Sequence, residues 1–172
     1  MDLPASSPHG VDERPPSPAL WTRRGFIPAL AAVVLAGLAG LLGVRSDTTS
    51  AQVGEWRLTL EHAELARAGF DVPWQVTVTH DGGFDGPLTL AVTGDYFDIF
   101  ETQGFMPEPT EMTRDGDTLY LTFAAPPRGD TFVVAYDAYI QPAAQRGADG
   151  TLSVLDAGVA VASLDFETRL LP

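Results

Sequence analysis

The chain of 172 residues contains no cysteine and no lysine. Without cysteine, a disulfide framework, a cysteine-ligated zinc or iron–sulfur centre and a thiol nucleophile are excluded. All 10 basic residues are arginine, against 23 acidic residues, and the formal net charge is −13. Such a charge repels phosphates and anionic lipid headgroups, so we expect no nucleic-acid partner and no general electrostatic binding to a membrane surface.

Charge is also missing from one long stretch near the N-terminus. The 20 residues 25–44 (GFIPALAAVVLAGLAGLLGV) include no charged side chain. As a helix this stretch would extend roughly 30 Å, the thickness of the hydrocarbon core of a bilayer, and it has no polar stripe. We therefore predict a transmembrane helix over 25–44, preceded by a disordered, proline-rich cytoplasmic tail over 1–24.

The arginines around this stretch predict its orientation. Arg23 and Arg24 precede it, whereas Arg45 alone follows it directly, and positive charge is retained on the cytoplasmic side. We expect a protein of the cell membrane with a cytoplasmic N-terminus, a short linker over 45–54 and an exported domain over 55–172.

The same residues carry a resemblance. Thr22 to Ile27 (TRRGFI) is similar to the twin-arginine export motif through Arg23, Arg24 and Phe26, and the core that follows is rich in glycine and alanine, as in that family. The resemblance implies a leader, with the small residues up to Ala51 as a loose cleavage site. Alternatively, the two arginines are ordinary flanks of an uncleaved signal-anchor, and both interpretations stay open.

Small residues recur along the apolar stretch. Ala32, Ala36 and Gly40 follow one another at intervals of four and would form a face able to pack against another membrane helix. In a segment this rich in alanine and glycine, the same spacing also arises by chance.

From Glu55 onward, short runs of alternating apolar and polar residues are separated by Gly, Asp and Pro. This pattern is typical of an all-β sandwich, and we predict about seven to nine strands. Only Glu61 to Ala68 (EHAELARA) favours a helical turn. The runs that predict strands include 56–60, 72–78, 88–92, 118–123, 131–140, 151–155 and 159–170.

The run Gly69 to Val78, with the turn Gly82-Gly83 and the run Pro87 to Leu90, is similar to a strand unit of bacterial immunoglobulin-like or fibronectin-type modules. The whole chain also resembles bacterial single-pass membrane proteins that carry such an exported domain and have no assigned activity. The resemblance implies an immunoglobulin-like β-sandwich and brings no catalytic residue with it.

The densest aromatic stretch lies between the predicted strands. Four aromatic residues, Tyr96, Phe97, Phe100 and Phe105, fall within ten positions. Large amphipathic side chains in a loop suit a partner-binding surface, because they supply contact area at small entropic cost. The alternative is that these rings fill the core.

Carboxylates in this stretch are the candidates for a metal. Asp95, Asp98 and Glu101 could together offer oxygen ligands to Ca²⁺, but their spacing matches no known calcium loop, and solvated turns explain them equally. We expect no metal site, no cofactor, no catalytic residues and no enzymatic activity.

Three hypotheses for the function follow. The first is a membrane-anchored extracytoplasmic interaction or accessory module that serves another envelope protein. The second is a soluble ligand-binding protein exported by a twin-arginine leader, and the third is a calcium-dependent adhesion domain. After Ser46 the chain has 20 acidic and 6 basic residues, a net charge of −14, which favours a basic or apolar partner.

Overall fold

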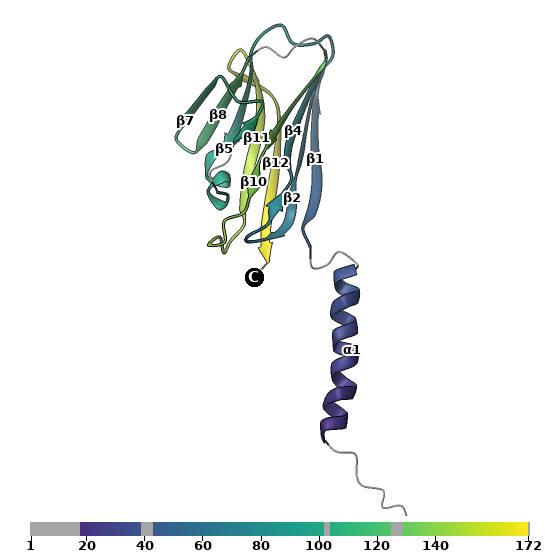
Figure 1. Cartoon of the computed structure of the whole chain (residues 1–172). Coiled ribbons are helices and arrows are strands. Elements are labelled where there is room, and N and C mark those ends of the chain that lie inside the picture. Colours follow the sequence, from purple (N-terminus) through teal and green to yellow (C-terminus); the bar gives the residue numbers. More distant parts are fainter. Residues whose placement is uncertain (1–17, 39–42, 102–103, 125–128, 172) are drawn as a thin grey trace, which may run out of the picture. The chain divides into compact units, whose positions relative to one another are not determined.

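The computed structural model describes residues 18–38, 43–101, 104–124 and 129–171. The chain divides into an N-terminal unit, residues 1–42, and a C-terminal unit, residues 43–172. The first unit holds one helix in its described part, and the described C-terminal unit is built almost entirely of strands (Figure 1). The prediction of a mostly β domain is thereby confirmed. Most of the predicted cytoplasmic tail lies outside the described residues.

Helix α1 spans Pro18–Leu38 and begins seven residues before the predicted start at position 25. Proline is tolerated in the first turn of a helix, because its missing N–H would have no partner there. No further glycine or proline interrupts the chain before Gly25, so the helix takes in both Arg23 and Arg24.

The described helix ends at Leu38, so its uncharged part covers residues 25–38 and not the whole predicted span 25–44. Among the residues that the structure describes, no helix combines the length and the apolar character needed to cross a bilayer. The transmembrane helix predicted over 25–44 is therefore not found as such, and residues 39–42 lie outside the description. Ala32 and Ala36 lie on α1 at the expected interval, whereas Gly40 falls in the undescribed part.

The stretch expected to be a linker over 45–54 is instead a strand. β1 (Arg45–Val53) pairs antiparallel with β2 (Trp56–Arg67) along its whole length, and Gly54 with a φ of 58° turns the chain between them. The polar sequence of β1 suits an edge strand, whose outer side faces water. Pairing with β2, rather than apolar patterning, makes this segment a strand.

The helical turn expected at Glu61 to Ala68 is wrong as well, because this stretch continues β2. The register slips by one residue at Glu64: Ala63 pairs with Ser46, but Leu65 pairs with Arg45. The strict alternation of buried and exposed side chains breaks down next to this β-bulge, where the neighbours His62 and Ala63 are both buried. The bulge disturbs the alternation and produces a pattern that resembles a helix.

In the described part of the chain, ten strands form one sheet in the order β6-β9-β4-β2-β12-β11-β5-β8-β7, with β1 added beside β2. The short strands β3 and β10 form a separate pair. The remaining strands are β3 Asp71–Val72, β4 Trp74–His80, β5 Leu88–Thr93, β6 Phe105–Met106, β7 Glu111–Asp115, β8 Thr118–Phe123, β9 Thr131–Tyr136, β10 Ala138–Tyr139, β11 Ala148–Asp156 and β12 Val159–Leu171.

The sheet curls because β2 changes its neighbour along its length. Its first part, 56–62, lies between β1 and β4, whereas its last residues, 65–67, pair in parallel with 169–171 of β12. The inner faces of the two arms share one apolar core, an arrangement consistent with a β-sandwich (Figure 1). The fully buried side chains include Leu58, Leu60, Val76, Val78, Leu90, Val92, Leu121, Ile140, Leu152 and Val154.

Two buried hydroxyl groups connect the arms near this junction. The Thr168 hydroxyl on β12 donates to the carbonyl of Ala63 on β2 at 2.6 Å, and it lies 2.9 Å from the Tyr96 hydroxyl. Thr168 is completely buried. Because an unpaired buried polar group costs free energy, this chain of hydrogen bonds stabilises the junction.

Replacing Thr168 by Val tests that role. Valine keeps the shape of threonine but leaves the Ala63 carbonyl and the Tyr96 hydroxyl without this partner. We expect Thr168→Val to lower the free energy of unfolding by about 1–3 kcal/mol, measured by urea denaturation. Thr113→Val on the exposed strand β7 is the matched control and should change stability by less than about 0.5 kcal/mol. Equal effects at both positions would contradict the assignment.

Candidate functional site

The predicted aromatic stretch forms a short 3-10 helix, η1 (Gly94–Ile99), directly after β5. Backbone and side-chain hydrogen bonds tie η1 and the two residues after it to the segment around β10. The Gln141 side-chain amide donates to the carbonyls of Phe100 at 2.6 Å and Asp98 at 3.2 Å. The Glu101 N–H donates to the Tyr139 carbonyl at 2.9 Å. The stretch is therefore a fixed part of the domain surface.

Aromatic rings from several strands gather beneath η1. Phe97 lies 5.4 Å from Trp74 and 5.1 Å from Tyr136 between ring centroids, in edge-to-face contacts. Phe105 lies 4.7 Å from Tyr136. Rings from β4, β6, β9 and η1 thus form one cluster, and such contacts add to the free energy of burial.

A hollow of about 470 Å³ opens on this cluster, and we call it the aromatic hollow. Its floor is aromatic, the Met112 side chain on β7 is 55% exposed, and the rim carries the exposed carboxylates of Asp98 and Glu101. The lining residues are Phe97, Asp98, Phe100, Glu101, Phe105, Met112, Leu119, Tyr136 and Gln141.

The structure divides the four aromatic residues predicted as a binding loop. Phe97, Phe100 and Phe105 line the aromatic hollow, although Phe100 and Phe105 are also largely buried in the core. Tyr96 is only 1% exposed and does not line the hollow. Its hydroxyl bonds to Thr168, and burial raises the pKa of the phenol far above its ordinary value.

The three carboxylates considered for calcium are not brought together as a metal site. Asp95 forms an ion pair with Arg114, whose guanidinium lies against Gly94. A Cβ atom at Gly94 would lie 3.0 Å from the Arg114 Cζ, so glycine allows this close approach. Within the described ranges, no group of three or more His, Asp or Glu side chains is arranged to hold a metal ion.

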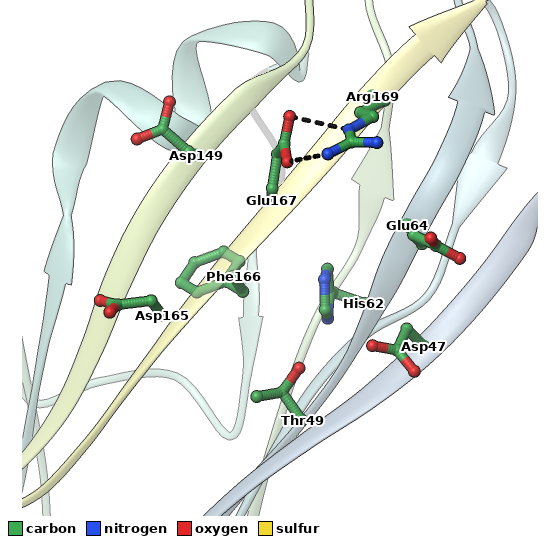
Figure 2. Close-up of a pocket in the computed structure, with 9 residues that line it drawn as sticks. All are labelled: Asp47, Thr49, His62, Glu64, Asp149, Asp165, Phe166, Glu167 and Arg169. Atoms are coloured by element: carbon green, nitrogen blue, oxygen red, sulfur yellow. Dashed lines mark hydrogen bonds and ion pairs between the residues drawn. The ribbon is translucent and has the colours of Figure 1, made fainter.

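A second hollow, of about 420 Å³, lies where β1 and the first part of β2 diverge from β12, and we call it the acidic hollow (Figure 2). Four elements contribute to it: β1, β2, β11 and β12. Its lining residues are Asp47, Thr49, His62, Glu64, Asp149, Asp165, Phe166, Glu167 and Arg169.

His62 is the buried polar group of the acidic hollow. The residue is 3% exposed, and its Nδ1 atom is buried and has no hydrogen-bond partner within the described part of the chain. The ring stands edge-on to Phe166 at 5.5 Å between centroids, and His62 pairs across the strands with Asp47. Burial lowers the pKa of His62 and thereby favours the neutral imidazole, whereas Asp47, the backbone at Glu167 and Leu60, and Glu64 oppose the shift.

Arg169 is the positively charged residue of the acidic hollow, and Glu167 engages it. The Arg169 Nε and Nη2 atoms donate to the two Glu167 carboxylate oxygens at 2.9 and 2.8 Å (Figure 2). This pairing lowers the pKa of Glu167 and raises that of Arg169. Asp165 accepts a hydrogen bond from the Thr151 hydroxyl at 2.7 Å.

Sequence reasoning missed the acidic hollow. The sequence alone suggests no role for His62. Asp47 was assigned to a linker, and no local motif connects positions 47, 62, 149 and 167. The signal that was available is the adjacency of His62 to Glu61 and Glu64 in a run that could also be a strand.

Comparison with known proteins leaves the predicted relationships open. No family model matches the chain, and no curated protein matches it. The resemblance to bacterial single-pass membrane proteins and to the twin-arginine motif therefore stays a prediction.

The buried phenol of Tyr96 predicts a pH dependence of stability. Its pKa is raised in the folded state, so folding favours the protonated form. That contribution is complete below the pKa of an unfolded tyrosine, about 10, and is lost as the pH rises above it. We expect the free energy of unfolding of the native chain to fall more steeply above about pH 10 than that of Tyr96→Phe.

Urea denaturation of both proteins at several alkaline pH values measures the difference. The control is Tyr120→Phe, which removes the phenol of the partly buried Tyr120 on β8. Parallel pH profiles for the native chain and Tyr96→Phe would contradict the prediction, because they would show that the Tyr96 phenol ionises as readily in the folded as in the unfolded state.

Proposed function

We propose that the β domain is an interaction module without catalytic activity of its own, and that it binds an envelope protein through the aromatic hollow. The observation that carries the proposal is a rigidly supported aromatic floor that opens to the surface between two acidic rim residues. Phe97, Met112 and Leu119 offer an apolar surface, while Asp98 and Glu101 stand at its edge.

The composition of the aromatic hollow supports protein recognition. Interfaces commonly place aromatic and methionine side chains at the centre and polar groups at the rim, and anchors of the partner fill central pockets. A hollow of about 470 Å³ has room for one large apolar side chain. Methionine adapts its shape to such an anchor, because its side chain is unbranched and flexible.

The negative charge of the domain indicates which class of partner it would bind. The chain after Ser46 carries a net charge of −14, and Asp98 and Glu101 flank the aromatic hollow. A partner whose apolar anchor is accompanied by arginine or lysine would be steered towards this surface and held in register by it. The partner class is therefore a protein with a basic, aromatic- or leucine-bearing segment.

We further propose that the domain is an immunoglobulin-like sandwich that lies outside the cytoplasm. Residues 25–44 would attach it to the cell membrane, with the N-terminus in the cytoplasm. The uncharged sequence of that stretch and the two arginines before it support this placement. The alternative is a soluble, ligand-binding form released by cleavage of a twin-arginine leader.

The position of β1 bears on this choice. Cleavage after Ala51 would remove most of β1, which pairs with β2 from Arg45 to Val53. It would also expose the edge of β2 and remove Asp47 and Thr49 from the acidic hollow. These costs favour an attached form that keeps β1.

Photo-crosslinking in cells and a binding measurement with two methionine variants test the proposed role of the aromatic hollow. A photo-crosslinking residue at position 112 in intact cells should give a discrete adduct with one envelope protein, and one at exposed Val133 on β9 should not. With that protein purified, Met112→Asp should weaken binding at least tenfold, whereas Met106→Asp, at an exposed position outside the lining, should have little effect. Equal crosslinking at 112 and 133 would contradict the proposal.

Membrane attachment has its own test. The intact mass of the protein is measured separately in the membrane fraction and in the culture fluid. We expect the full-length mass, confined to membranes and resistant to carbonate extraction. A mass corresponding to residues 52–172 in the fluid would support the cleaved form instead and would show that the domain tolerates the loss of β1.

A further inference from the structure

The acidic hollow has an excess of acceptors over donors. Five carboxylates line it, and its one arginine, Arg169, is engaged by Glu167. Across the described part of the chain, no ion pair is formed by the other four carboxylates, those of Asp47, Glu64, Asp149 and Asp165. Carboxylates that share a site repel one another, so a cation placed there would be stabilised.

His62 is a second and independent observation. Among the described residues, the buried Nδ1 atom of His62 has no hydrogen-bond partner, which is uncommon because an unpaired buried polar atom costs free energy. The neutral ring has one N–H and one lone pair, and the lone pair can accept a hydrogen bond from a ligand. Its place in the lining, opposite Asp47 and beside Glu64 on the same strand, would provide an acceptor for a donor bound in the hollow (Figure 2).

We propose that the acidic hollow binds an alkylammonium group, with the charged head among Asp47, His62 and Glu64 and the methylene stem against Phe166. An ammonium head carries three N–H donors and no acceptor, which complements two carboxylates and an imidazole lone pair. The group is a lysine side chain of a basic partner or a free aliphatic amine.

The geometry favours an organic cation over a metal ion. The described residues contain no group of three or more His, Asp or Glu side chains arranged to hold a metal, although five carboxylates surround the hollow. Their oxygens come from four different strands around a space of about 420 Å³, which is too wide for a bare ion and wide enough for a stem of several carbon atoms. Phe166 and the methyl group of Thr49 supply apolar contacts for that stem.

The acidic hollow is separate from the aromatic hollow, and the two linings share no residue. The ammonium site therefore does not depend on the proposed function. Met112→Asp should leave amine binding unchanged, so failure of one proposal is distinguishable from failure of the other.

The test uses the full chain and three probes. These are 1,5-diaminopentane, Nα-acetyl-lysine methylamide and the same lysine derivative acetylated at Nζ, which has no charge. Binding is measured by titration calorimetry and by the ¹⁵N and ¹H chemical shifts of the His62 ring. We expect at least one of the two charged probes to bind and to shift the His62 signals, and the acetylated probe to do neither. The stronger charged probe identifies the source, a free amine or a lysine side chain.

Two charge-removing variants and a matched control complete the experiment. Asp47→Asn and Glu64→Gln should each weaken binding about tenfold, while the native circular dichroism spectrum is retained. Glu111→Gln removes one exposed carboxylate on β7 and should leave affinity unchanged. The proposal is overturned if neither charged probe shifts His62 at millimolar concentration, if the neutral probe binds equally, or if Ca²⁺ or Zn²⁺ binds at His62 and the amines do not.

Discussion

The parallel pairing between the last residues of β2 and β12 is the constraint on which the rest of the domain depends. Among the described residues, three pairs make this contact, and it joins the two arms of the curled sheet. The hydroxyl of Thr168 satisfies the Ala63 carbonyl there and is itself bonded to Tyr96. On the neighbouring strand, a Cβ atom at Gly147 would collide with the Thr168 carbonyl, so any larger residue there would push the start of β11 away from β12.

Both hollows are consequences of this junction. The arms diverge from it, and the acidic hollow lies at the fork between β1 and β2 on one side and β12 on the other. The aromatic hollow forms where η1 covers rings from β4, β6 and β9, which belong to the opposite arm. A single small contact therefore positions an apolar surface and a charged one on the same domain.

Much of the strand pattern was predictable because it is local. Apolar residues alternate along the runs 72–78, 88–92 and 118–123. These runs lie in β3 and β4, in β5 and in β8, and most of their apolar side chains are buried. The failures have the opposite cause. The polar segment 45–53 becomes a strand only through β2, and the bulge at Glu64 hides the strand character of 61–67. Pairing partners lie outside any local window, so tertiary contacts override intrinsic preference there.

For the sites, the sequence indicated the aromatic stretch but not its division between surface and core, since Tyr96 and Phe97 differ in burial although they are neighbours. By itself the sequence determined the β character of the domain, its acidic charge, and a core without disulfides that rests on apolar packing, because these follow from composition and alternation. Only the tertiary structure decided that Asp47, His62 and Glu167 meet. That meeting needs β1, β2 and β12 to lie together, and burial at the fork lowers the pKa of the imidazole and leaves its Nδ1 without a hydrogen-bond partner among the described residues.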